Sequence, residues 1–448
     1  MAEFQRNLFL LRGVCIYKNL LQDSVVQAYV RLLEALASQD GPEKLLNNYS
    51  EFLSKLVERT ELGAGGIVGD PWRNHILELM LGEENTFTRK AEYLALREMS
   101  QGLAGLVKQD LRILQAVFNV SLESICSEAA LRLKEQAADF LLPDVSGPFH
   151  PLYSGPEDYS RVELKQVLVS APDWGQCLGL LAGYVKSHGC GIFGKYLAFR
   201  WVPGRQLAGI SNPDSVRLEN LISYERQRGE VVANTRRFVK GYPANNVLLY
   251  GDRGTGKSST CKGLIHEFGK AGLRLVEVNR ESFKDFQEIM ALLSTRPQRF
   301  IIFIDDLSFE EYETEYKSLK AVMEGGLQAQ PENVLIYATS NRKHLIKETF
   351  EDRTSLRSEG ELHPGDAQEE KISLADRFGM VVTFLRPDQK TYLEIVQGLA
   401  DKEGISLDPE ELNALALKWE MLHNGRSGRT AKQFIQDLQG RTSMSDEV

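Results

Sequence analysis

The sequence predicts an α/β fold, in which a five-stranded parallel sheet flanked by helices follows a mostly α-helical N-terminal region and precedes a C-terminal helical region. Two observations lead to this prediction. Five short apolar runs of strand length recur between residues 245 and 385, and the segments between them are long enough for helices. Before residue 142 and after residue 388, apolar residues instead recur at three- and four-residue spacing, which is typical of amphipathic helices.

The composition limits the classes of protein that the chain can belong to. A length of 448 residues is too great for one hydrophobic core, so we expect two or three domains. A net charge of −9 argues against nonspecific nucleic-acid binding by the whole surface, although it allows a local basic patch. Five scattered cysteines without a C-x-x-C pair indicate neither a disulfide framework nor a zinc site. No apolar run has the length of a membrane span and the N-terminus lacks a signal-peptide pattern, so we expect a cytoplasmic protein without a membrane partner.

The first half of the chain is expected to hold a helical domain, residues 1–141, and a connector with helices and a strand, residues 142–209. A segment rich in Pro, Gly and Ser opens the connector, and residues 195–202 form its expected strand. No catalytic constellation is recognisable in the helical domain. We interpret its charged residues, among them Glu92 and Asp110, as solvated faces of helices.

The strongest motif follows the apolar run at residues 247–250, in the stretch NNVLLYGDRGTGKSSTC. Its glycines, lysine and serine match G-x-x-x-x-G-K-[ST], the P-loop spacing. Glycines let the backbone N–H groups converge on a polyphosphate, Lys257 adds a cation, and Ser258 is placed to bind Mg²⁺. The predicted phosphate-binding residues are Gly251, Asp252, Arg253, Gly254, Thr255, Gly256, Lys257, Ser258 and Ser259.

Two carboxylates follow the third apolar run, FIIFI at residues 300–304. A carboxylate at the carboxyl end of a parallel strand lies beside the phosphates of a bound nucleotide, where it can hold Mg²⁺. We assign the metal to Asp305 together with Ser258. Asp306 is then the candidate for orienting the attacking water.

Further candidates lie on either side of these motifs. Asn341 follows the fourth run, where its amide can hold the attacking water, although a loop-capping role is an alternative. Arg377 precedes the fifth run, residues 380–384, at a strand entrance from which it can reach a neighbouring subunit. Ahead of the P-loop, residues 221–224 include apolar side chains that either contact the base or pack in the core. A polar insertion spans residues 351–371.

The order of these features resembles the AAA+ ATPase superfamily over about residues 210–440. More closely, the stretches NNVLLYGDRGTGKSS, IDDLSFE, YATSNRKHL, SLADRFG and GRSGRTAKQF resemble an uncharacterised bacterial family of predicted AAA+ ATPases, and GDPWRNHIL extends the resemblance to the helical front end. The resemblance implies an ATPase core at residues 210–385, a helical lid at residues 386–448, ATP and Mg²⁺ as ligands, and a homo-oligomer resembling a hexameric ring.

The resemblance also implies roles by position. Asn341 matches the first sensor, Arg377 matches an arginine finger that acts in trans, and Arg429 matches the second sensor, with Arg426 as the runner-up. One departure concerns the acidic pair, because most AAA+ enzymes have Asp-Glu where this chain has Asp305 and Asp306. The shorter carboxylate predicts slow hydrolysis or the use of another acid.

Three functions follow from these observations. The favoured one is an oligomeric ATPase that remodels an unknown protein or nucleoprotein client chosen by the helical front end. The second is a slow, nucleotide-controlled binding switch or scaffold. The third is a DNA-associated loader, because Arg236, Arg237 and Lys240 cluster ahead of the P-loop. Phe283 or Phe286 is a further candidate, for a pore loop that contacts the client.

Overall fold

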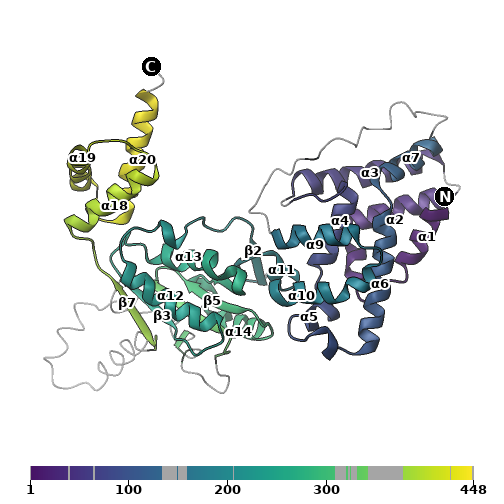
Figure 1. Cartoon of the computed structure of the whole chain (residues 1–448), viewed down its shortest axis with the longest axis horizontal. Coiled ribbons are helices and arrows are strands. Elements are labelled where there is room, and N and C mark those ends of the chain that lie inside the picture. Colours follow the sequence, from purple (N-terminus) through teal and green to yellow (C-terminus); the bar gives the residue numbers. More distant parts are fainter. Residues whose placement is uncertain are drawn as a thin grey trace, which may run out of the picture. The chain divides into compact units, whose positions relative to one another are not determined.

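The computed structural model describes residues 2–38, 41–63, 66–133, 149, 159–204, 206–307, 319–320, 323, 330–341, 377–423 and 425–445 (Figure 1). The chain forms two compact units, Met1–Lys195 and Tyr196–Val448, and each is described by itself. The insertion predicted at residues 351–371 lies outside the described residues.

The first unit is built of helices around one apolar core. Its helices are α1 (Ala2–Leu11), α2 (Ser24–Ala37), α3 (Pro42–Glu61), α4 (Pro71–Gly82), α5 (Thr86–Ala91), α6 (Gln101–Asn119), α7 (Leu122–Leu133), α9 (Tyr159–Ser170), α10 (Leu178–His188) and α11 (Gly191–Lys195). Asp23 caps α2 by accepting hydrogen bonds from the amides of Val25 and Val26. The rings of Tyr29 and Trp72 pack in the core with centroids 4.2 Å apart.

The connector expected at residues 142–209 is divided between the two units. Leu168 and Trp174, from α9 and the turn after it, are fully buried in the core of the first unit, and the indole N–H of Trp174 donates to the carbonyl of Leu168 at 2.8 Å. The predicted strand is present as β1 (Ala198–Val202), but it belongs to the sheet of the second unit. Local patterns predicted these elements, whereas the partners against which they pack are far away in the sequence.

Two acidic residues that we interpreted as solvated are buried instead. The Oδ2 atom of Asp110 accepts from the amides of Ile16 and Tyr17 at 2.6 and 3.0 Å, and Glu92 accepts from the amide of Cys190 at 3.1 Å. Asp110 and Glu92 are 0% and 3% exposed. The interpretation was wrong because backbone donors more than 90 positions away satisfy both carboxylates.

The second unit contains a seven-stranded sheet with the order β2-β1-β4-β5-β6-β3-β7. The five predicted strands are present as β3 (Val247–Gly251), β4 (Leu273–Glu277), β5 (Arg299–Ile304), β6 (Val334–Ser340) and β7 (Met380–Phe384). All pair in parallel. The expectation of five strands was too low, because β1 pairs in parallel with β4 and forms an antiparallel hairpin with β2 (Gln206–Ile210).

Helices α12 (Glu225–Val239) and α13 (Lys257–Phe268) contribute Phe238 and Leu264 to the core formed with the sheet. Helix α14 (Phe286–Ser294) packs against β6. Phe283 and Phe286 are 0% and 1% exposed, and their ring centroids lie 5.4 Å apart. The pore-loop prediction for these two residues was therefore wrong, because both rings pack in the interior.

The chain ends in a small helical lid formed by α18 (Gln389–Lys402), α19 (Pro409–Leu422) and α20 (Gly428–Ser445). Tyr392, Ala416 and Phe434 lie in its own apolar core. Asp388 caps α18 by accepting from the amide of Thr391 at 2.8 Å. Among the helices of the described ranges, none is both long and apolar enough to span a membrane.

Candidate functional site

The predicted P-loop follows β3 and leads directly into α13. Gly251 has φ of 138°, and a Cβ atom there would lie 1.9 Å from the carbonyl oxygen of Phe384, at the end of β7. Gly254 and Gly256 have φ of 75° and 89°, which lie in the region that favours glycine. The next amide, that of Asp252, donates to the same Phe384 oxygen at 3.1 Å. The glycines therefore permit both the turn and its close approach to β7.

Lys257 is the first residue of α13, and its side chain is turned back into the loop. Its Nζ atom donates to the carbonyls of Gly251 and Asp252 at 2.7 and 2.6 Å, and to Oδ1 of Asn341 at 3.0 Å. Burial lowers the pKa of Lys257, while the carboxylates of Asp252, Asp306 and Asp305 act in the opposite direction. The cation is thus held within the P-loop and linked to the carboxyl end of β6.

Ser258 meets the acidic end of β5. Its Oγ atom donates to Oδ1 of Asp305 at 2.6 Å, and the hydroxyl of Thr339 donates to the same carboxylate oxygen at 2.6 Å. Ser258 and Asp305, which are 47 positions apart, are the two residues that we assigned to the metal. The parallel pairing of the sheet brings them together, because the carboxyl ends of parallel strands lie at one edge.

Asp306 is held from two sides. Its amide donates to the Thr339 hydroxyl at 2.9 Å, and its Oδ1 atom accepts from Nδ2 of Asn341 at 2.6 Å. The φ of Asp306 is 51°, in the left-handed region, where Asp and Asn are more often found than other residues with side chains. This backbone gives a physical reason for the departure from Asp-Glu, because the longer glutamate is less suited to it.

The lid contacts the P-loop through the segment that opens α20. The amide of Arg429 donates to the carbonyl of Gly254 at 3.3 Å, and the side chain of Arg429 is exposed. Arg426, the runner-up for the second sensor, instead pairs with Glu420 inside the lid at 2.9 Å. Of the two arginines, Arg429 is therefore the one whose backbone contacts the P-loop.

Arg377 lies apart from this group. It precedes β7, at the amino end of the strand, whereas the P-loop meets β7 at its carboxyl end, where Gly251 pairs with Phe384. The two ends of β7 are four residues apart, or about 13 Å at the rise of a strand.

Of the remaining P-loop residues, Arg253 is exposed, Ser259 is half-buried and Thr255 is buried.

The segment ahead of the P-loop joins the core to the lid. Ile222 packs against the apolar core of the lid, and the Tyr224 hydroxyl donates to the carbonyl of Leu385 at 2.7 Å. Burial, and then the carboxylates of Asp252 and Asp388, raise the pKa of Tyr224 to about 12. Packing thus accounts for Ile222 and Tyr224. A role in contacting the base stays a prediction for these two residues and for Leu221.

Thr339 also belongs to this group, although it was not among the residues that we predicted. It is 2% exposed and bonds both members of the acidic pair, through the side chain of Asp305 and the amide of Asp306. The sequence contained a signal for this residue. Thr339 lies two positions before Asn341, near the carboxyl end of the same predicted strand, so the two side chains are expected on one face of the strand and close to the acidic pair.

The donor set fits Mg²⁺. A serine hydroxyl and a carboxylate are the oxygen ligands that this hard cation prefers, and Ser258 and Asp305 already lie within hydrogen-bonding distance of one another. A bound ion would neutralise charge that develops on phosphate oxygens. With Lys257 beside it, the site is suited to a nucleoside polyphosphate.

A family model described as "Protein of unknown function (DUF815)" matches residues 194–442, more than half of the chain. A comparison with curated proteins gave no match. Among solved structures, the Holliday junction branch migration motor RuvB of Thermotoga maritima is 16% identical, with 52% of this chain and 66% of that chain covered and a TM-score of 0.35. A point mutant of it is 15% identical, with 52% and 67% covered and a TM-score of 0.36.

Proposed function

We propose that the chain, which belongs to the DUF815 family of proteins of unknown function, binds and hydrolyses ATP. The P-loop that follows β3 supports this proposal, as do the contacts of Lys257 with Asn341 and of Ser258 with Asp305. In this proposal Lys257 binds the β- and γ-phosphates, while Ser258 and Asp305 hold Mg²⁺. Asp306 and Asn341 orient the attacking water. Arg429 reports on the nucleotide from the lid.

One observation carries the proposal, namely the hydrogen bond of 2.6 Å between Ser258 and Asp305. It brings the first turn of α13 and the end of β5 to one point. The contact of Lys257 with Asn341, at 3.0 Å, links the same loop to the end of β6. Phosphoryl transfer depends on positioning and electrostatic stabilisation. These two contacts support the proposal because they join the Lys257 cation to Asn341 and the two proposed metal ligands to each other.

We further propose that the protein acts as a homo-oligomer resembling a hexameric ring. The position of Arg377 supports this idea, because it precedes the amino end of β7 while the P-loop of the same chain contacts the carboxyl end. In this proposal, Arg377 reaches the nucleotide of a neighbouring subunit rather than that of its own chain. In comparable enzymes such a residue contributes on the order of 10³ to 10⁵ in rate.

The proposed work of this oligomer is to remodel a protein or nucleoprotein partner that the first unit selects. A second candidate function is a slow, nucleotide-controlled switch. It is favoured by the contact between the Arg429 amide and the Gly254 carbonyl, because a lid that contacts the P-loop directly can respond to the nucleotide. The two candidates differ in turnover, whereas both require nucleotide binding.

The proposal is tested by measuring phosphate release and ATP binding over a range of protein concentrations, with and without Mg²⁺. Lys257→Ala is expected to abolish both ATP binding and phosphate release. The matched control is Lys262→Ala, since Lys262 lies on the same helix but pairs with Asp214 at 3.6 Å and faces no predicted ligand. Loss of both activities in Lys257→Ala, with the control unchanged, is the expected result.

The same experiment separates the two candidates. If specific activity rises with concentration as a larger species appears in sedimentation, the oligomeric ATPase is supported. Tight ATP binding with negligible turnover in a monomer would favour the switch. Absence of ATP binding by the wild-type protein would contradict both.

A further inference from the structure

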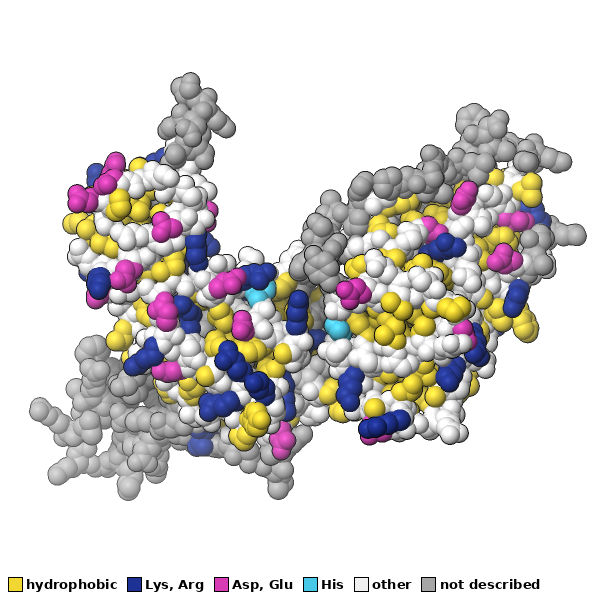
Figure 2. Space-filling view, viewed as in Figure 1, with side chains coloured by type: hydrophobic (Ala, Val, Ile, Leu, Met, Phe, Trp, Pro, Cys, Tyr) yellow, Lys and Arg dark blue, Asp and Glu magenta, His cyan; other side chains and the backbone are white. Residues whose placement is uncertain are grey.

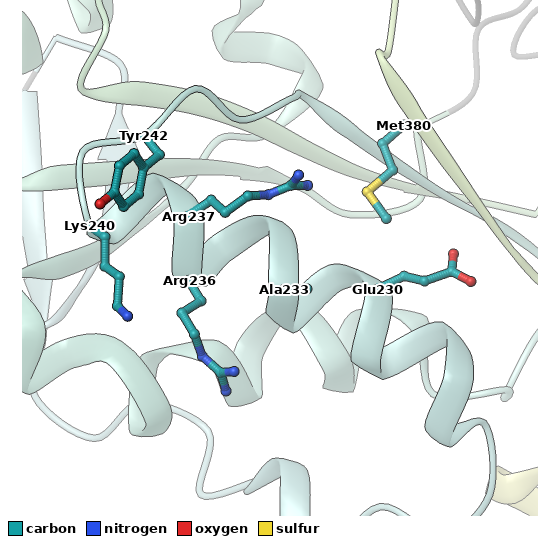
Figure 3. A pocket seen from close by; sticks show the side chains of 7 residues that line it. All are labelled: Glu230, Ala233, Arg236, Arg237, Lys240, Tyr242 and Met380. Carbon is teal, nitrogen blue, oxygen red and sulfur yellow. The ribbon is translucent and has the colours of Figure 1, made fainter.

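The second unit has a cavity beside α12, away from the P-loop. A cavity of about 520 Å³ is lined by Glu230, Ala233, Arg236, Arg237, Lys240, Tyr242 and Met380 (Figure 3). Arg236 and Lys240 direct their cationic groups to the same side of the helix, Tyr242 lies beside the Lys240 stem, and Arg237 points toward Met380. The wall is therefore cationic, with an aromatic ring and a thioether beside the charges.

The three cations have no carboxylate partner among the residues that the structure describes. The only hydrogen bond of their side chains within those ranges joins Arg237 to Oδ1 of Asn234 at 3.4 Å. Glu230, the one acid that lines the cavity, pairs with Arg226 at 3.5 Å. Figure 2 shows the dark blue Lys and Arg side chains gathered over this part of the unit. An anion would therefore find cations whose charge is not already neutralised.

Three cations so close together at the end of α12 destabilise the helix by themselves. Arg236 and Lys240 are four positions apart, so they lie on one face, and like charges at this spacing repel. The negative end of the helix macrodipole compensates only about half a charge, whereas this turn carries three positive charges. An anionic ligand would remove the remaining repulsion.

The cavity is separate from the nucleotide site. Met380 is the first residue of β7 and pairs with Val247, at the amino end of β3. The P-loop begins at Gly251, at the carboxyl end of β3. The cavity and the P-loop of one chain thus lie at opposite ends of the parallel strands β3 and β7, so a ligand in the cavity would not contact a nucleotide held by the same P-loop.

We propose that this cavity binds single-stranded nucleic acid. Arg236, Arg237 and Lys240 would contact successive phosphates, and the ring of Tyr242, which is 63% exposed, would stack on a base. Cationic grooves combined with exposed aromatic rings are the usual means by which proteins bind single strands without sequence preference. An acidic peptide would use the cations but would have no need of the ring. This inference goes beyond the proposed ATPase and does not depend on hydrolysis.

The test uses the full chain and a fluorescently labelled 20-nucleotide single-stranded DNA of mixed sequence, with binding followed by anisotropy. Three phosphate contacts on a single strand predict a slope of about −2 in a plot of log affinity against log salt concentration. The binding affinity should therefore fall roughly 20-fold between 50 and 200 mM salt. Replacing Arg236, Arg237 and Lys240 together by Gln is expected to abolish binding. Tyr242→Ala is expected to weaken it about tenfold with the slope unchanged.

Matched controls distinguish this site from general charge. Replacing the exposed cations Lys18, Lys108 and Lys186 of the first unit by Gln removes the same charge and is expected to leave binding unchanged. Lys257→Ala should bind DNA normally, which separates a failure of this inference from a failure of the ATPase proposal. Thermal unfolding checks the fold of each variant.

Several outcomes would overturn the inference. One is the absence of DNA binding by the wild type at 50 mM salt, and another is binding that the triple variant retains. A third is displacement of the DNA by a 20-residue poly-glutamate at equal charge concentration together with an unchanged affinity in Tyr242→Ala. That result would assign the cavity to an acidic peptide.

Discussion

Asn341 donates a hydrogen bond from its Nδ2 atom to Oδ1 of Asp306 at 2.6 Å, while its own Oδ1 atom accepts from Lys257 at 3.0 Å. One amide at the end of β6 therefore joins the acidic end of β5 to the P-loop. Because an amide carries both a donor and an acceptor, it can hold a carboxylate and a cation at the same time. This pairing fixes the carboxylate that we propose orients the attacking water.

The first prediction concerns Asp306. Asp306→Asn keeps the size and removes the negative charge, so we expect ATP binding to persist and hydrolysis to fall by about 10² or more. The measurement is phosphate release at saturating ATP, with binding followed by a fluorescent nucleotide. Equal turnover in the variant would assign the water-orienting role to another group.

A second prediction concerns the length of the same side chain. Because Asp306 has φ of 51° and its Oδ1 atom bonds Asn341, we expect Asp306→Glu to lower turnover rather than raise it. Phosphate release at saturating ATP, compared between Asp306→Glu and the wild type, tests this prediction. A marked rise in phosphate release would show that the short acid limits hydrolysis, and it would support the slow-switch function for the natural sequence.

The third prediction concerns Thr339, which holds both acids. Thr339→Val preserves the side-chain shape and removes the two hydrogen bonds to Asp305 and to the Asp306 amide, so we expect the Mg²⁺ concentration for half-maximal activity to rise by roughly tenfold. Thr235→Val is the control, since Thr235 is also buried but bonds Tyr337. An unchanged Mg²⁺ requirement would exclude this role for Thr339.

The fourth prediction tests whether Arg377 acts on a neighbour. Arg377→Ala and Lys257→Ala are each expected to be inactive in hydrolysis. A ring mixed from equal amounts of the two variants should recover roughly a quarter of the wild-type activity, because about one interface in four then combines an intact P-loop with an intact arginine. Arg226→Ala, which changes a side chain that is 85% exposed, is the control. No recovery on mixing would contradict action in trans.

The fifth prediction concerns Glu83, which follows α4 in the first unit and is 9% exposed. Burial raises the pKa of Glu83 from 4.5 to about 7, so the folded state retains a proton that the unfolded state releases. The contribution of Glu83 to the free energy of unfolding therefore falls as the pH rises from about 4.5 to 7. Glu83→Gln, which stays neutral, should equal the wild type in stability at about pH 4 and exceed it by about 3 kcal/mol at pH 8, since one pKa unit corresponds to about 1.4 kcal/mol.

Urea unfolding of Glu83→Gln and the wild type at both pH values checks this prediction. The difference between the two proteins isolates Glu83, because every other titratable group is present in both. Equal stability of the two proteins at pH 8 would show that ionisation of Glu83 does not lower the free energy of unfolding.

The amino-acid sequence by itself determined the strands and the P-loop of the second unit. The strands from β3 to β7 are short apolar runs, and the residues around Lys257 follow a fixed spacing, so both are local properties that a linear pattern can carry. The placement of Asp305 beside Ser258 could also be predicted, because parallel strands present their carboxyl ends at one edge.

Only the tertiary structure decided the contacts between distant segments. The pairing of β1 with β4, the burial of Asp110 by amides from the start of the chain, and the double role of Thr339 each depend on partners more than 30 positions away. Periodicity shows which face of an element is apolar, but it does not show which backbone donor reaches a carboxylate. Those pairings follow from the closing of the whole fold, which satisfies buried polar groups wherever the chain brings them together.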